Sequence, residues 1–120
     1  MKKKVFNCPA EMTIQLIGGK WKTILLYNLR RGPKRFGELR KLSMNVSQAT
    51  LARELRDLEE SGIINRTKMG RENYNGVEYS LTEKGQSLRP IVNALIKWGL
   101  EYQKDYVVGE FKIAGFQKTK

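Results

Sequence analysis

Small, polar and basic side chains are grouped on one side of the segment SQATLARELRDLEE, residues 47–60. Leu51, Leu55 and Leu58 recur at helical spacing, which predicts a helix that turns one apolar stripe toward a core. The opposite side is small near its start and basic further along: it consists of Ala49, Arg53, Arg56 and Glu60, with Thr50 and Asp57 on its flank. A helix with such a face fits the DNA major groove, which is about 12 Å wide. The pattern also fits an ordinary amphipathic surface helix, so the neighbouring segments must decide.

The first turns of this helix are where base contacts are expected. Ser47 stands at the N-cap, where its hydroxyl can accept from a backbone N–H. Gly62 follows the last turn, where a left-handed residue often ends a helix. The residues expected at base edges are Ser47, Gln48, Ala49, Thr50 and Arg53. Gln48 can pair with adenine and Arg53 with guanine, although the predicted angle of Gln48 lies nearer the leucine side.

The charge of the chain indicates a polyanionic partner. Among 120 residues, 23 Lys and Arg stand against 12 Asp and Glu, which gives a formal net charge of +11 and a pI near 10.0. Such a domain usually binds nucleic acid, here double-stranded DNA, or an anionic membrane surface. No stretch approaches the roughly 18 apolar residues of a membrane span, so we expect a cytoplasmic protein that is nucleoid-associated when bound to DNA. The side chains expected on phosphates are Lys20, Lys22, Lys34, Arg35, Arg40 and Arg56.

The residue types argue against an enzyme. Cys8 is the single cysteine and there are no histidines, so an intramolecular disulfide and the Ser–His and Cys–His nucleophilic pairs are excluded. A zinc site within one chain would lack its usual Cys and His ligands. The carboxylates of Glu54, Asp57 and Glu59 fit a solvated helix face better than an acid–base pair. The sequence therefore predicts no catalysis, no cofactor and no metal.

The segments before residue 47 predict the rest of a helix-turn-helix. Residues 1–7 are expected to form a flexible basic arm. Helices are expected from Pro9 to the Gly18-Gly19 pair, from Lys20 or Trp21 to Arg30, and from Arg35 to Leu42. The second of these is apolar nearly all round, which predicts a central place in the core. A short helix, a tight connection and the longer helix after Ser47 form the helix-turn-helix pattern.

The period changes after Gly62 in a way that predicts a wing. Residues 63–69 and 77–81 read as two strands, and the second alternates apolar with polar residues. The connection between them, GRENYNG, is polar and ends in the turn signal Asn75-Gly76. We expect a β-hairpin whose tip carries Arg71, Asn73 and Asn75, with Arg71 either at a minor groove or phosphate or simply in solvent.

The chain ends predict a dimer. A last helix is expected from Thr82, with Pro90 kinking or restarting it. Its apolar surface and that of the first helix exceed what one small domain can bury, which favours a homodimer over closure of the monomer core. The interface residues expected are Met12, Leu16, Leu88, Val92, Leu95 and Trp98. The fold class is thus mainly α with a small β-hairpin (α+β): a winged helix-turn-helix over residues 8–102, followed by a tail, 103–120, of no assigned structure.

Several short motifs, taken in order, resemble one family. They include Cys8-Pro9-Ala10-Glu11, the run from Ile17 to Lys22, the run from Gly32 to Phe36, Leu55–Glu59 and the run from Val77 to Gly85. Over residues 8 to about 99 the chain is similar to the HxlR-type winged helix-turn-helix transcriptional regulators, relatives of the MarR group. The resemblance implies a bacterial homodimer on a palindromic operator, with the helix after Ser47 as recognition helix and residues 69–76 as wing tip. Family wings often carry a proline pair where this chain has Asn75-Gly76.

The resemblance also gives Cys8 a candidate role, because several family members sense oxidants or electrophiles through the corresponding cysteine. A helix N-terminus and nearby lysines favour the reactive thiolate. With one cysteine per chain, the possible products are an intersubunit disulfide or a mixed disulfide with a small thiol. The alternative is a small apolar residue packed at the helix start.

Two other functions compete with a sequence-specific regulator. A basic winged helix can serve as a sequence-blind architectural protein or as a protein-interaction module. A lysine-rich arm with an apolar tail can also lie on a membrane surface. The sequence indicates no particular small-molecule effector.

Overall fold

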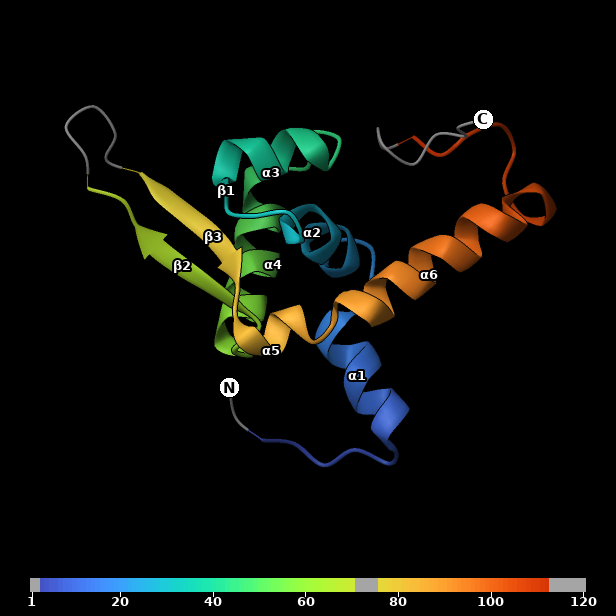
Figure 1. Cartoon of the computed structure of the whole chain (residues 1–120), viewed down its shortest axis with the longest axis horizontal. Coiled ribbons are helices and arrows are strands. Elements are labelled where there is room, and N and C mark those ends of the chain that lie inside the picture. Colours follow the sequence, from blue (N-terminus) through green and yellow to red (C-terminus); the bar gives the residue numbers. More distant parts are fainter. Residues whose placement is uncertain (1–2, 71–75, 113–120) are drawn as a thin grey trace.

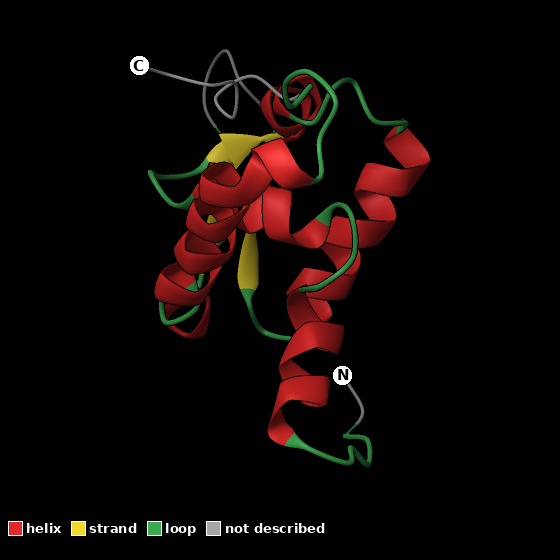
Figure 2. Ribbon diagram, turned by 90° about the vertical axis from the view of Figure 1, so that its right-hand side faces the viewer, coloured by secondary structure: helices red, strands yellow, loops and turns green. Residues whose placement is uncertain are grey.

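Helices make up most of the chain, and short strands from separate segments form a small sheet beside them (Figures 1 and 2). A computed structural model describes residues 3–70 and 76–112. The elements are α1 (Pro9–Ile17), α2 (Lys22–Leu29), β1 (Lys34–Arg35), α3 (Phe36–Leu42), α4 (Gln48–Glu60), β2 (Ile64–Lys68), β3 (Val77–Leu81), α5 (Glu83–Gln86), α6 (Arg89–Tyr102) and the 3-10 helix η1 (Gln103–Asp105).

The core forms where α2, α3 and α4 meet the sheet. Leu25, Leu26 and Leu29 of α2 are buried, which confirms the central place predicted for that helix. The leucine stripe of α4 is buried as well, and Ile63, Ile64 and Tyr79 close the core from the sheet side. Burial of each such side chain is worth about 1.5–3 kcal/mol, so this shared core fixes which side of α4 faces solvent.

The turn between α3 and α4 depends on two consecutive residues in the left-handed region. Met44 has φ 58° and Asn45 has φ 55°, a conformation that is uncommon for residues other than glycine. Hydrogen bonds from Asn45 N to Arg40 O at 2.9 Å and from Val46 N to Ser43 O at 3.2 Å close the turn. The sharp reversal brings Ser47 directly to the N-cap of α4, as predicted.

The sheet has three antiparallel strands in the order β1-β3-β2. β2 and β3 form the predicted hairpin, in register from Ile64 opposite Leu81 to Lys68 opposite Val77. Met69 N donates to Gly76 O at 2.8 Å beyond the last pair. The predicted tip residues Arg71, Asn73 and Asn75 lie outside the described residues.

The strand β1 corrects the expected start of the third helix. Lys34 pairs with Tyr79 and Arg35 with Glu78, so Arg35 is extended and α3 begins at Phe36. The pairing satisfies the edge of β3 that faces away from β2, a contact between segments distant in sequence. Arg35 then caps α3, and its backbone N–H donates to Glu38 Oε1 at 2.8 Å.

The last helix, expected from Thr82 with a kink or restart at Pro90, restarts and forms two helices, α5 and α6. Thr82 caps the short α5 through a bond from Gly85 N to its hydroxyl at 3.0 Å. The chain then restarts at Arg89 with Pro90 in the first turn of α6, because proline cannot supply a helical N–H from an interior position. Both α6 and α1 extend away from the hairpin (Figure 1).

Candidate nucleic-acid interface

The solvent-facing side of α4 carries the residues predicted to read bases. We call Ser47, Gln48, Ala49, Thr50 and Arg53 the reading face. Ser47, Gln48 and Ala49 are exposed, Thr50 is half-buried and the Arg53 side chain is 58% exposed. Ser47 Oγ accepts from Thr50 N at 3.1 Å, so the hydroxyl expected at a base edge also caps the helix.

The basic residues predicted on phosphates fall into two groups. Lys20, Arg35 and Arg56 are exposed, whereas Lys34 and Arg40 are half-buried. Lys20 Nζ lies 4.9 Å from the ring centroid of Trp21, which orients its ammonium. Arg40 Nε donates to Val46 O at 2.6 Å, so part of this guanidinium holds the turn before α4.

Lys22 departs from the role predicted for it. Its ammonium lies 2.9 Å from Glu54 Oε1 and 3.3 Å from Asp57 Oδ2, and its side chain is only 16% exposed. Burial by itself lowers the pKa of Lys22, but hydrogen bonds and Coulomb attraction from Glu54 and Asp57 outweigh it and raise that pKa above its ordinary value. Lys22 therefore links α2 to α4, and its ammonium is neutralised by two carboxylates of α4 instead of being free for a phosphate.

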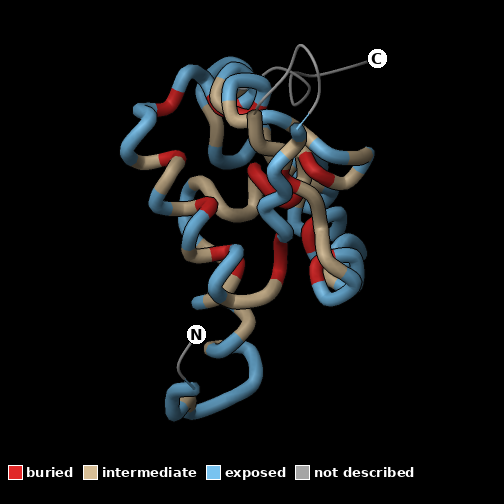
Figure 3. Tube along the Cα trace, turned by 90° about the vertical axis from the view of Figure 1, so that its left-hand side faces the viewer, coloured by how far each residue is buried: buried red, intermediate tan, exposed pale blue. Residues whose placement is uncertain are grey.

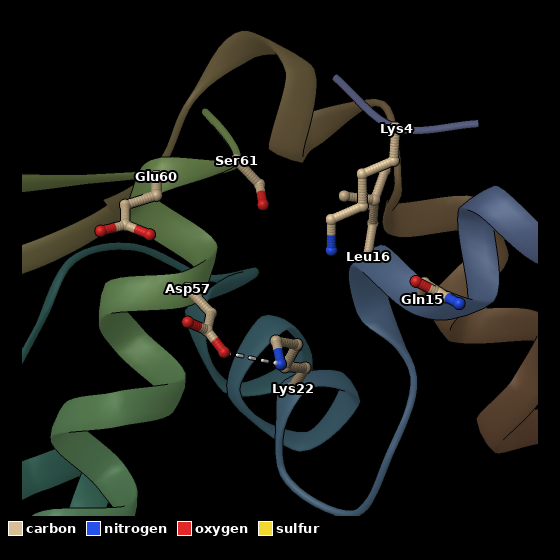
Figure 4. Close-up of a pocket in the computed structure, with 7 residues that line it drawn as sticks. All are labelled: Lys4, Gln15, Leu16, Lys22, Asp57, Glu60 and Ser61. Atoms are coloured by element: carbon tan, nitrogen blue, oxygen red, sulfur yellow. Dashed lines mark hydrogen bonds and ion pairs between the residues drawn. The ribbon is translucent and has the colours of Figure 1, made fainter. Parts of the chain in front are cut away.

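A hollow of about 310 Å³ adjoins this pair (Figure 4). Its lining is Lys4, Gln15, Leu16, Lys22, Asp57, Glu60 and Ser61. The carboxylate of Asp57 points across the hollow to the ammonium of Lys22. The side chains present here are both cationic and anionic, so the hollow has no single charge that would select a ligand.

The segment before α1 is mostly exposed (Figure 3), and Cys8 at its end is exposed as well. Its Sγ accepts from Glu11 N at 3.4 Å, so the thiol is the N-cap of α1. Glu11 in turn accepts from Asn7 N at 2.6 Å. The alternative expected for Cys8, a small apolar residue packed at the helix start, does not account for its exposure.

The residues predicted at a dimer interface differ in exposure. Met12, Leu95 and Trp98 are 41%, 53% and 55% exposed, while Leu16 and Leu88 are half-buried. Val92 is only 2% exposed and belongs to the core of its own chain. It faces α2 rather than solvent and has no surface to offer a partner, which corrects its assignment.

The expected interface residues leave out other exposed apolar side chains on the same helices. Ile14 of α1 is 64% exposed and Ile91 of α6 is 43% exposed. The ring of Trp98 stands 4.8 Å from that of Tyr102 and 6.3 Å from that of Tyr106, between centroids. Helical spacing from Leu95 and Trp98 could have indicated Ile91 and Tyr102, because i and i+4 residues share a face.

Residues 3–70 and 76–112 contain neither a cluster of metal-ligating side chains nor a membrane-spanning helix. There, no three His, Cys, Asp or Glu side chains gather in a way that could hold a metal ion. Within the same ranges, no helix is both long and apolar enough to cross a membrane.

Two helices joined by a tight turn, followed by a β-hairpin, define the winged helix-turn-helix class. The model of the HxlR-like helix-turn-helix family matches residues 16–106. The chain belongs to the HxlR-like helix-turn-helix family and is a transcriptional regulator of the MarR-like winged-helix type.

Relatives and solved structures agree with this assignment. The chain is 46% identical over 111 residues to the uncharacterized HTH-type transcriptional regulator YkvN of Bacillus subtilis, covering 92% of this chain and 93% of that one. The structure of the redox regulator HypR in its reduced form matches with a TM-score of 0.76 and 42% identity, over 82% of this chain and 96% of HypR. The reduced form of the regulator YodB from B. subtilis matches with a TM-score of 0.71 and 30% identity, over 85% of this chain and 100% of YodB.

Proposed function

We propose that this regulator binds a two-fold symmetric operator in double-stranded DNA as a homodimer. The observation that carries the proposal is the reading face of α4, which is turned to solvent while the leucines of the same helix are buried. Two such helices related by a two-fold axis would enter successive major grooves about 34 Å apart. Such a protein would act in the cytoplasm, on the nucleoid when bound to DNA.

The contacts divide by chemistry. Arg53 suits guanine and Gln48 suits adenine, while Ala49 and Thr50 offer methyl groups to thymine. Phosphate neutralisation falls to Lys20, Lys34, Arg35, Arg40 and Arg56, which set the orientation of the domain but carry no sequence information. Residues 71–75 of the wing would add a further backbone or minor-groove contact.

The dimer would form through α1 and α6. Their exposed apolar residues, among them Ile14, Leu95 and Trp98, would leave water on association. Both helices extend away from the hairpin (Figure 1), so a second copy there leaves the hairpin uncovered.

The proposal includes regulation through the thiol of Cys8. Support comes from its exposure, its place at the positive end of α1, and the similarity to the redox regulator HypR. A two-electron thiol oxidant of the azo class, such as diamide, would take two electrons from two Cys8 thiols of different subunits, or from one Cys8 thiol and one small thiol, and its N=N bond would be reduced to the hydrazine. The products are one disulfide and the reduced oxidant, which gains both protons.

Fluorescence anisotropy against DNA from upstream of the protein's own gene tests the proposal, with a scrambled duplex as reference at about 150 mM salt. At least roughly 10³-fold tighter binding to the upstream DNA is expected. Equal, weak binding to both duplexes would favour the architectural alternative, and co-sedimentation with anionic liposomes would favour the membrane-surface alternative.

A further inference from the structure

One carboxylate links the interior of the domain to the reading face. Glu54 Oε1 lies 2.9 Å from the ammonium of Lys22, and Glu54 Oε2 lies 3.6 Å from Arg53 Nη2. The side chains of Lys22 and Glu54 are 16% and 15% exposed, whereas that of Arg53 is 58% exposed. The chain of charges therefore runs from a shielded cation on α2, through a shielded anion on α4, to an exposed cation on the reading face.

The position of Lys22 makes it a structural connector. It is the first residue of α2, and its ammonium also lies 3.3 Å from Asp57, one helical turn after Arg53 (Figure 4). Two carboxylates neutralise this lysine on the protein side. An ammonium held in this way would have to break both ion pairs to contact a phosphate.

An exposed arginine loses side-chain conformational entropy when it binds a base. A partner that restricts the side chain before binding makes that loss smaller. Glu54 is the partner that the structure gives Arg53. Lys22 fixes Glu54 in turn, because its short ion pair holds the other oxygen of the same carboxylate.

We propose that Lys22 and Glu54 are positioning residues that set the recognition helix against α2 and orient Arg53 for base readout. The inference rests on the proposed function, in which Arg53 contacts a base. Loss of the pair would leave the exposed basic residues in place, so sequence-independent attraction to DNA would persist. The effect would fall on the preference for operator over other DNA.

The test begins with the full-length protein and a pool of random duplexes, from which wild type enriches its preferred sequence. Affinity for that duplex and for a scrambled one is then measured over a range of salt. Glu54→Gln keeps the size of the side chain and is expected to reduce the ratio of the two affinities about tenfold. Asp57→Asn is the matched control, since it makes the same charge change next to Lys22 without touching Arg53, and should stay within about twofold of wild type.

Two further comparisons separate positioning from other roles. In an Arg53→Ala background, Glu54→Gln should cause no additional loss of preference for the enriched duplex, because the guanidinium that Glu54 orients is absent. Lys22→Met should lower the preference but leave the slope of log affinity against log salt unchanged, whereas loss of a phosphate contact would reduce that slope by about 0.9. Lys22→Arg should restore most of the preference, and Lys104→Met, at an exposed position beyond α6, controls for the lost charge.

The outcomes are distinct. If wild type enriches no duplex, the proposed function fails. If wild type is specific but Glu54→Gln keeps or sharpens the preference, or still lowers it when Arg53 is alanine, the positioning role is wrong. Circular dichroism checks folding. If Lys22→Met does not fold, the result for the isosteric Glu54→Gln variant alone decides whether the positioning role holds.

Discussion

Arg40 Nε donates a hydrogen bond of 2.6 Å to the carbonyl oxygen of Val46 across the turn between α3 and α4. The backbone of Arg40 also takes part, since its carbonyl accepts from Asn45 N at 2.9 Å. One residue on α3 thus holds both the middle and the end of a turn with two left-handed residues. The direction in which α4 leaves the turn depends on these bonds.

Replacing Arg40 should therefore destabilise the domain before any effect on DNA is considered. We expect Arg40→Met to lower the free energy of unfolding by about 1–3 kcal/mol, because a shielded carbonyl loses a charged donor. Arg40→Lys should recover little, since lysine keeps the charge but not the planar donor group. Urea denaturation measures both variants, with Lys41→Met at the exposed neighbouring position as control. Full recovery by lysine would contradict the argument.

The Lys22 ion pairs should make stability depend on pH in the alkaline range. The pKa of Lys22 is raised in the folded protein. Its contribution to the free energy of unfolding is therefore fully present below the pKa of lysine in the unfolded chain, about 10.4, and is lost as the pH rises through the folded pKa. We expect wild type to exceed Lys22→Met by about 1–3 kcal/mol near pH 7. That difference should narrow above pH ~10.5.

Measuring this difference at each pH removes the titration of the other lysines and tyrosines, which both proteins share. The free energy of unfolding of the two proteins is compared at matched ionic strength. A difference that stayed constant from neutral to alkaline pH would show that the methionine acts through packing alone.

The elements that local periodicity specifies were predictable from the sequence. The buried stripe of α4 and its Ser47 cap follow from spacing within one segment, and the β2–β3 hairpin follows from two strand-like runs around a turn signal. The strand β1 was not predicted, because its two residues pair with β3 only once the chain has folded back. Lys22 was misassigned for the same reason: its partners lie on another helix, and a lysine in a basic sequence carries no mark of being shielded.

Charge on the exposed side of α6 should separate the subunits. Trp98→Glu places a carboxylate where the side chain is 55% exposed, so the monomer fold should persist while the apolar association is lost. Sedimentation velocity should show the mass of a monomer. Val92→Ala is the informative comparison, since Val92 lies in the core and the change should cost about 1–3 kcal/mol of stability but keep the subunits together.

Cys8→Ser should remove redox sensitivity while preserving the helix start. A serine hydroxyl is a better N-cap than a thiol, so α1 should keep its bond to Glu11 N. Without oxidant, the variant should bind DNA with the same affinity as the reduced wild type. After diamide, wild type should run as a linked pair of chains on a non-reducing gel or gain the mass of a small thiol, and its affinity for operator should change. The serine variant should show no covalent product after diamide and no change in its affinity for operator. An equal response of both proteins to diamide would place the sensing elsewhere.

Substitutions on α4 and β1 should distinguish base readout from phosphate contact. Arg53→Ala should cost about 1–3 kcal/mol on the preferred duplex and relax discrimination at one base pair, because a guanine loses its bidentate donor. Lys34→Ala should weaken binding to every duplex alike and lower the salt slope by about 0.9, since a phosphate contact releases counterions whatever the sequence. Titration of both variants against preferred and scrambled duplexes at several salt concentrations measures the two effects together. If Arg53→Ala changed only the salt slope, the reading face would be wrongly placed, and the exposed side of α4 would serve to bind the backbone.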